Sequence, residues 1–160
     1  MKDKEYTGKV RCVHDSSNKN LNPEQRQLVY TKAMELQELY KDVNKLIEKV
    51  NEIQEILTAD SVAYRKKKNA IAFHDDLQKL KGELMGIKKT SIFADEKRLR
   101  EKVSELYSNF CYTEAAPNKT QLESIDDLKK EYGQQREALK KVIDKHLPKN
   151  PDVKMDKKIE

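Results

Sequence analysis

The residues best suited to chemistry in this chain are its histidines, its cysteines and one short acidic cluster. His74 is followed directly by Asp75 and Asp76, and imidazole and carboxylate groups are ligands that zinc accepts. Consecutive residues on a helix point about 100° apart, so these three side chains cannot all converge on one ion. The pattern therefore favours a helix surface over a metal site. His14 and His146 lie too far away in the sequence to complete a motif by spacing.

The two cysteines, Cys12 and Cys111, allow three interpretations. A catalytic thiol needs a base, and His14 lies close to Cys12 on the same side of an expected strand. Two packed thiols are commoner in a small helical protein, and one disulfide is a further alternative if the protein is exported. A disulfide between them would close a loop of about 100 residues and constrain the unfolded chain by about 4.7 kcal/mol.

Other motifs of catalysis and cofactor binding are missing from the sequence. It has no Glu-x-x-His pair of the kind that holds two metals in a four-helix bundle. It also lacks a Gly-x-x-x-x-Gly-Lys-Ser/Thr phosphate loop and a Gly-x-Ser-x-Gly elbow. We therefore expect a protein that is not an enzyme, with no catalytic residues, no cofactor and no metal site.

The composition favours long helices with solvated outer faces. The chain has 160 residues, a length typical of one domain. Charged residues make up 38%, and there are only four Gly, four Pro and no Trp. These values exclude a Gly-rich nucleotide fold, a collagenous or low-complexity polymer and a disulfide-dense miniprotein. No apolar run is long enough to span a bilayer and none follows Met1, so we expect neither a membrane span nor a signal peptide.

A formal net charge of +5 raises the alternative of nucleic-acid binding. Lysines and acids are interleaved through most of the chain, however, and this mixing weakens the field that a phosphate backbone would meet. The exception is a run of four basic residues, Arg65, Lys66, Lys67 and Lys68. On a helix these four point in different directions, so we expect a solvated helix surface and no specific nucleic acid partner. A free-standing basic protein that binds nucleic acid through this run is the alternative.

Three segments of the chain differ in pattern. Residues 1–22 combine alternation of apolar and polar residues over Tyr6–His14 with a polar loop, which predicts an extended N-terminal arm containing one strand. Residues 23–147 carry helical periodicity and form the expected bundle. Residues 148–160 contain two prolines and mostly charges, which predicts a disordered charged tail.

The strongest helical signal follows Asn22-Pro23-Glu24, where Asn can cap the helix and Pro suits its first position. Over residues 29–57, apolar residues recur at alternating spacings of three and four, with Lys32 as the one polar break. They are Val29, Leu36, Leu39, Val43, Leu46, Val50, Ile53 and Leu57. Tyr40 and Ile47 widen this stripe, which suits packing against two neighbours.

Three further stripes predict three more helices. The first covers residues 70–87, the second begins near Ala94, and the third opens with Thr120-Gln121-Leu122-Glu123, which fits a capping box. Their expected core positions are Ala70, Phe73, Leu77, Leu80, Leu84 and Ile87; Leu99, Val103, Leu106 and Phe110; and Ile125, Leu128, Tyr132, Leu139, Val142 and His146. Because helices joined by short loops pack antiparallel, we predict an all-α, up-down antiparallel four-helix bundle with two long helices and one short helix.

Three blocks of the sequence carry a resemblance to a known family. They are the run from Gln25 to Ile53, the strand-like Val10-Arg11-Cys12-Val13-His14-Asp15, and the block from Leu99 to Gln121 with its Ala115-Ala116-Pro117 loop. Together, over residues 8–147, they resemble the C-terminal helical domain of sortilin-like, Asp-box (BNR) repeat propeller proteins. The resemblance implies an accessory domain next to a propeller, in an exported parent protein that is periplasmic or on the cell surface.

The chain departs from that family in one respect. It has no Ser-x-Asp-x-Gly-x-x-Trp Asp-box and no Trp at all, so it cannot contain a propeller. In the family, ligand chemistry belongs to the propeller, and none of it transfers to residues of this chain. The resemblance therefore implies a packing role and no catalytic residues.

We expect a non-catalytic helical-bundle accessory module that packs against an adjacent propeller domain or binds another protein. The residues expected to take part are Val10 and Cys12 in the arm, Tyr30 and Tyr40 on the first helix, and Arg65, Lys66, Lys67 and Lys68 in the basic run. A coiled-coil homo-oligomer, such as a homodimer paired through residues 29–57, is a further alternative.

Overall fold

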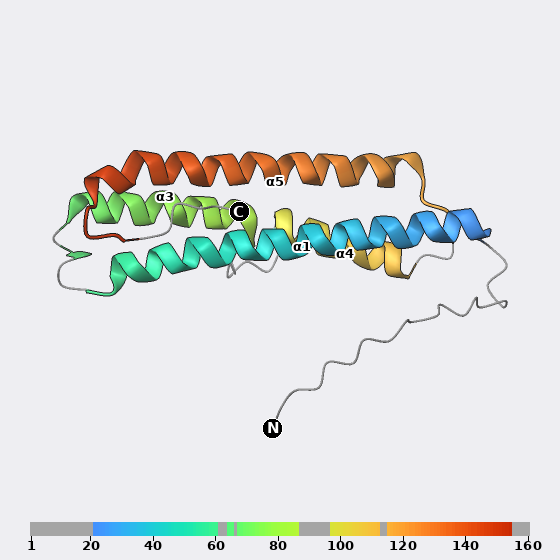
Figure 1. The fold of residues 1–160 in the computed structure, drawn as a ribbon, viewed down its shortest axis with the longest axis horizontal. Helices are drawn as coiled ribbons and strands as arrows, with labels where there is room; N and C mark the ends of the chain where they lie inside the picture. The colour runs from blue at the N-terminus through green and yellow to red at the C-terminus, as the bar shows by residue number, and fades with distance from the viewer. Residues whose placement is uncertain (1–20, 61–63, 66, 87–96, 113–114, 155–160) are drawn as a thin grey trace, which may run out of the picture.

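The described part of the chain folds into four α-helices and one turn of 3₁₀ helix. They are α1 (Pro23–Thr58), α3 (Lys68–Leu84), α4 (Leu99–Cys111) and α5 (Lys119–His146), followed by η1 (Leu147–Lys149). The computed structural model describes residues 21–60, 64–65, 67–86, 97–112 and 115–154. The predicted all-α bundle of four helices is confirmed (Figure 1). The expected strand at Tyr6–His14, with Val10 and Cys12, and also Lys66, lie outside the described residues.

The two long helices begin with the same capping arrangement. At α1, Asn22 Oδ1 accepts a hydrogen bond from Gln25 N (2.8 Å), and Gln25 Oε1 accepts one from Asn22 N (2.9 Å). At α5, Asn118 and Gln121 make the same pair of bonds at 2.8 and 3.0 Å. Each pair satisfies two backbone amides that have no partner within the helix. The start of α1 is confirmed, whereas the box predicted at Thr120 is wrong, because Asn118 caps α5 two residues earlier.

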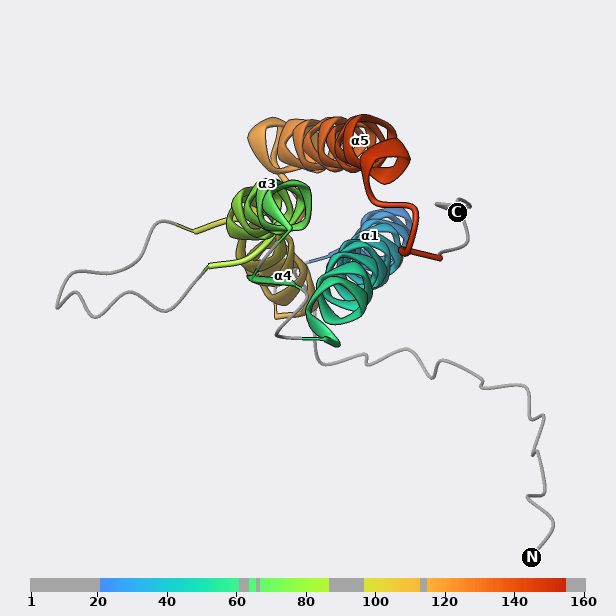
Figure 2. The same ribbon diagram turned by 90° about the vertical axis from the view of Figure 1, so that its left-hand side faces the viewer.

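The helices alternate in direction only in part. Seen end on, α3 and α4 share one side of the bundle, α1 forms the other and α5 closes the top (Figure 2). Along the long axis, α1 and α5 run the same way, while α3 and α4 follow one another and both run the opposite way (Figure 1). The expected reversals therefore occur from α1 to α3 and from α4 to α5, and the chain keeps its direction from α3 to α4.

Helix length explains this order. α1 has 36 residues, whereas α3 has 17 and α4 has 13. At a rise of about 1.5 Å per residue, α1 is about 54 Å long and the other two are about 26 and 20 Å. Only the two short helices in series cover the whole apolar stripe of α1.

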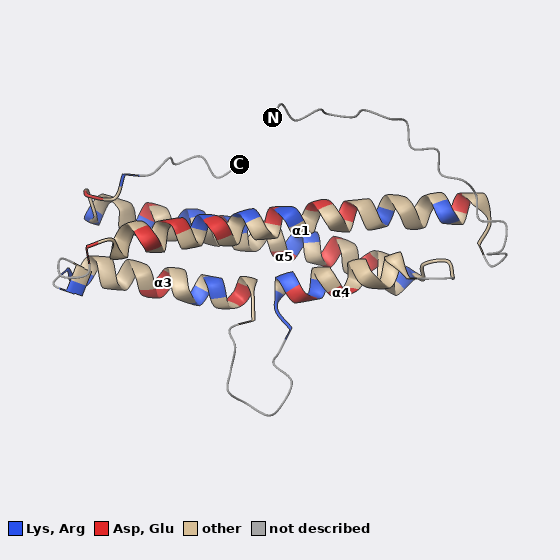
Figure 3. Cartoon of the chain, turned by 90° about the horizontal axis from the view of Figure 1, so that it is seen from below, with Lys and Arg blue, Asp and Glu red and all other residues tan. Residues whose placement is uncertain are grey.

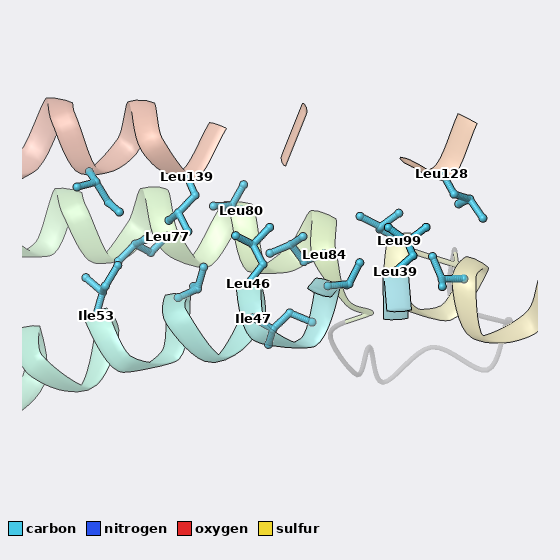
Figure 4. Close-up of a cluster of buried hydrophobic side chains, with 14 of the residues drawn as sticks. Leu39, Leu46, Ile47, Ile53, Leu77, Leu80, Leu84, Leu99, Leu128 and Leu139 are labelled. Carbon is cyan, nitrogen blue, oxygen red and sulfur yellow. The ribbon is translucent and has the colours of Figure 1, made fainter. Parts of the chain in front are cut away.

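One hydrophobic core extends along the bundle and draws on all four helices (Figure 4). Its fully buried members include Leu36, Val43, Val50 and Ile53 of α1, Phe73, Leu77 and Leu84 of α3, Leu99 and Val103 of α4, and Ile125 and Leu139 of α5. These positions are among those that the sequence predicts. On α5, Ile143 is buried and Val142 only half-buried, so the core face there is displaced by one residue from the prediction.

Glu101 joins the end of α3 to the start of α4. Its Oε2 accepts hydrogen bonds from Gly86 N (3.0 Å) and from Arg98 N (3.3 Å). Arg98 in turn donates a hydrogen bond from Nη1 to Glu83 Oε2 near the end of α3 (3.2 Å). Backbone amides outside the regular helical ladder need such acceptors. One carboxylate therefore links the two short helices end to end.

Replacing Glu101 with alanine is expected to lower the free energy of unfolding by about 0.5–2 kcal/mol, the usual cost of losing a capping acceptor. Urea denaturation followed by circular dichroism measures this. Glu101→Gln is the matched control, since its amide oxygen can accept from the same two amides, and it should lose less. An alanine variant as stable as the parent chain would contradict the linking role.

The segment after α5 is packed where the sequence predicts disorder. Asn150 is buried, and its Nδ2 donates a hydrogen bond to His146 O (2.8 Å). Val153 packs against the core, and Asp152 accepts a hydrogen bond from Lys67 Nζ at the start of α3 (2.5 Å). Residues 148–154 are therefore ordered against the bundle and not disordered as predicted. The side-chain hydrogen bond of Asn150 and the packing of Val153 hold a segment that has few apolar residues. Residues 155–160 lie outside the described part.

Candidate functional site

The residues that the sequence singles out do not form one site. Tyr30, near the start of α1, is 58% exposed, whereas Tyr40 is half-buried against the core. Arg65 has helical conformation, Lys67 lies just before α3, and Lys68 begins that helix. Tyr30 lines a groove between α1 and α5, while the basic residues lie near the other end of α1. Tyr30 is therefore separated from the basic residues along α1, whereas Tyr64 lies beside Lys67 and Lys68.

The basic run is divided between separate helical segments. Arg65, Lys67 and Lys68 are exposed, as expected of a solvated surface, but the run does not lie on one helix, because α3 begins only at Lys68. Lys67 forms an ion pair with Asp152 (2.5 Å), although both side chains are more than half exposed. Elsewhere in the described chain, basic and acidic side chains alternate along the helices (Figure 3). This mixed pattern agrees with the interleaving that the sequence shows.

Cys111 is the last residue of α4 and carries an exposed, free thiol. The expectation of a packed thiol is wrong for this residue, because the helix ends there and leaves its side chain outside the core. Cys12 lies outside the described residues. A free thiol at Cys111 does not support the alternative of a disulfide between the two.

A buried polar cluster lies where the end of α5 meets α3. His146 is only 4% exposed, and its Nε2 lies 2.8 Å from Asp76 Oδ2. Lys145 Nζ donates a hydrogen bond to the same oxygen (2.8 Å). The ring of His146 stacks on Phe73, with the centroids 5.1 Å apart and the planes 5° from parallel. The hydrogen bonds from Lys145 and His146 hold the pKa of Asp76 well below its usual range.

This cluster stabilises the fold, and its geometry does not suit a metal. His74 and Asp75, the neighbours of Asp76, take no part in it: the His74 ring packs edge-on against Tyr64, with centroids 5.8 Å apart. The predicted divergence therefore holds for Asp76, whereas His74 Nδ1 lies 3.9 Å from Asp75 Oδ1. Within the residues that the structure describes, no group of three His, Cys, Asp or Glu side chains is placed to hold a metal ion.

The groove between α1 and α5 is the feature best suited to binding another molecule. Its volume is about 610 Å³. One wall is a single face of α1 from Tyr30 to Asp42, and the other consists of Lys129 and Tyr132 of α5. Met34 and Leu39 supply apolar side chains to its floor and rim. Its lining residues come from α1 and α5 alone. The ribbons of α3 and α4 lie on the other side of the bundle (Figure 2).

Charges in the groove are partly neutralised. Glu35 accepts hydrogen bonds from Lys129 across the groove (2.6 Å) and from Lys32 on its own helix (2.8 Å). These bonds lower the pKa of Glu35. At Tyr132, burial and then the nearby negative charge of Asp42 raise the pKa, so this hydroxyl keeps its proton at neutral pH. The groove thus combines a bridged ion pair with a neutral phenol.

The largest exposed apolar side chains gather at the same end of the bundle as this groove. Among the described residues they are Leu28, Tyr30, Met34 and Tyr112, with exposed fractions of 37%, 58%, 39% and 86%. The first three lie in the N-terminal third of α1, and Tyr112 directly follows α4. The start of α1 and the end of α4 lie at one end of the bundle (Figure 1). Of these four, only Tyr30 and Met34 line the groove, because Leu28 lies two residues from Tyr30 on the other side of α1 and Tyr112 follows α4.

Sequence reasoning found Tyr30 and missed its companions in the groove. Met34 lies one helical turn after Tyr30, on a face of α1 beside the core stripe. A second short apolar stripe at spacing of four was therefore the available signal. The approach of Lys129 to Glu35, 94 residues apart, had no local signal, because it depends on how α5 lies against α1.

In the described residues, none of the helices combines the length and the apolar character needed to cross a bilayer. No family model, curated protein or solved structure matches this chain. The likeness to the helical domain of sortilin-like BNR-repeat proteins accordingly depends on the residue pattern alone.

Proposed function

We propose that this protein is a non-catalytic helical-bundle module that binds a partner protein through the α1–α5 groove, in which Tyr30 and Met34 are exposed. The observation that carries this proposal is the exposure of Tyr30 and Met34, at 58% and 39%, in a groove of about 610 Å³. Aromatic residues and methionine are enriched in the centres of protein interfaces. Scattered single apolar residues would need no such explanation.

The partner in this proposal is either an adjacent domain of a longer polypeptide or a separate protein. The resemblance to sortilin-like BNR-repeat proteins favours a propeller domain as that neighbour. Binding of nucleic acid is the weaker alternative, since Lys67 is paired with Asp152 and the charges alternate along the helices. Pairing of two chains through residues 29–57 would disrupt the core, because that stripe is buried inside one chain.

A photoreactive amino acid placed at Tyr30 in the cells that make the protein tests this function. We expect a covalent adduct with one protein species, because the side chain at this position faces outward at the groove. The matched control is the same amino acid at Glu48, an exposed residue of α1 that does not line the groove. Met34→Lys in the Tyr30-labelled chain should reduce the adduct at least severalfold.

Two outcomes would count against this function. Equal adducts from positions 30 and 48 would show collision rather than binding at the groove. No adduct at either position, with the labelled chain shown by circular dichroism to be folded, would contradict partner binding through this surface.

A further inference from the structure

We propose that the α1–α5 groove binds one amphipathic α-helix of the partner, with the apolar stripe of that helix flanked by lysine or arginine. This inference rests on the proposed function and names the chemistry of the partner. Two properties of the groove carry it: the arrangement of its walls and the sign of its charges.

The walls of the groove suit a helix. The lining residues of α1 extend from Tyr30 to Asp42, which is about 18 Å or a little over three turns. Successive turns of α1 contribute them at spacings of four, so they form a continuous row that is inclined to the helix axis. The facing wall, Lys129 and Tyr132, comes from α5, which runs in the same direction as α1 (Figure 1). Lys129 and Tyr132 span less than one turn of α5, so α1 supplies most of the surface, and a helix with anchors at i, i+3 or i+4 and i+7 can lie along it.

The charges of the groove are mostly negative. Glu35, Glu38 and Asp42 line it, and Lys129 is the one basic residue among its lining residues. Lys129 is bonded to Glu35, so these two groups largely neutralise each other. Glu38 and Asp42 are left facing the groove.

Each of the two remaining carboxylates pairs with an exposed lysine of its own helix. Lys41 lies 2.7 Å from Glu38 and Lys45 lies 3.6 Å from Asp42, and each lysine side chain is more than half exposed. Exposed ion pairs of this kind are weak. Glu38 and Asp42 can therefore exchange these lysines for basic groups of an incoming helix.

A second copy of this chain fits the groove less well. Two copies of the groove placed face to face would bring both pairs of Glu38 and Asp42 together, and like charges opposed across an interface disfavour binding. A basic helix gains from the same carboxylates. The charge distribution therefore selects a different molecule as the occupant.

Fluorescence anisotropy with two designed helical peptides tests this proposal on the whole chain. The peptides share a leucine stripe over about four turns and differ only in their flanking residues, which are Lys in one and Glu in the other. We expect the Lys peptide to bind about tenfold more tightly or better. The chain has a net charge of +5, so attraction to its overall charge would favour the Glu peptide. A preference for Lys is therefore a property of the groove.

The double variant Glu38→Gln, Asp42→Asn keeps the size of both side chains and removes their charge. It should bring the two peptides to nearly equal affinity, and raising the salt concentration should weaken the preference of the parent chain. Met34→Lys should weaken both peptides, because it places a charge in the apolar floor.

Equal binding of the two peptides by the parent chain would overturn the proposal, as would no binding of the Lys peptide. A dimer of the parent chain that Met34→Lys abolishes would overturn it as well and assign the groove to a second copy. If neither peptide binds while the Tyr30 adduct persists, partner binding stands and the basic helix is wrong. If the Lys peptide binds but the photoreactive amino acid at position 30 gives no adduct, the groove prefers basic helices and the proposed function is wrong.

Discussion

Replacing Phe73 with alanine is expected to lower the free energy of unfolding by about 3–5 kcal/mol. Phe73 has no exposed surface, and its ring stacks on His146 at a centroid distance of 5.1 Å. Its removal leaves a cavity in the core and uncovers a histidine that is otherwise buried. Urea denaturation of the parent chain and the variant, followed by circular dichroism at neutral pH, gives the difference directly.

Phe73→Leu is the control for this prediction. It keeps an apolar side chain at the site and loses only the aromatic contact, so it should cost clearly less than alanine. A second comparison is Tyr30→Ala on the exposed end of α1, which should change stability by no more than about 0.5 kcal/mol. A cost at Phe73 no larger than at Tyr30 would contradict its place in the core.

Replacing Asp76 with alanine is expected to cost about 1–3 kcal/mol at neutral pH, because the buried Nε2 of His146 loses its partner. Lys145 also loses its acceptor, but this side chain is 61% exposed and water takes over that bond at little cost. Asp76→Asn retains an acceptor oxygen and should lose less. The measurement is again urea denaturation, with parent, Ala and Asn variants compared under one buffer.

The stability lost on replacing Asp76 should be smaller at acid pH than at neutral pH. Because Lys145 and His146 lower the pKa of Asp76 in the folded chain, this carboxylate stabilises the fold above its unfolded pKa of about 3.9. That contribution is lost as the pH falls towards the folded pKa. The stability difference between the parent chain and Asp76→Asn should therefore shrink below about pH 4. A difference of equal size at pH 7 and at acid pH would show that the charge of Asp76 contributes nothing.

The sequence predicts most of the helical architecture, since the information is local. Leucine stripes at spacings of three and four identify the buried faces of α1 and α3, and Asn22-Pro23 identifies the start of α1. Capping and periodicity rules misplace a position by one or two residues where two neighbouring residues can fill the same role. Asn118 and Thr120 can both cap α5, and Val142 and Ile143 both border its apolar face.

The parts that the sequence does not predict all depend on contacts between distant segments. The hydrogen bond between His146 and Asp76 joins residues 70 positions apart. The sequence of α5 shows only that His146 is near the end of that helix, and it gives no sign of the partner on α3. The shared direction of α3 and α4 follows from the length of α1, together with the bonds of Glu101 to Gly86 and Arg98. The groove needs α5 beside α1, an arrangement that neither stripe specifies alone.

The place of α5 after α3 and α4 in the chain also sets the order in which the two walls of the groove are synthesised. A ribosome releases α1 early, and α1 can pair with α3 and α4 while the rest of the chain is still being synthesised. The second wall of the groove, Lys129 and Tyr132, emerges about 90 residues after the first. A nascent chain therefore has no complete groove until α5 has left the exit tunnel, so under the proposed function a partner can bind only once the core is nearly closed.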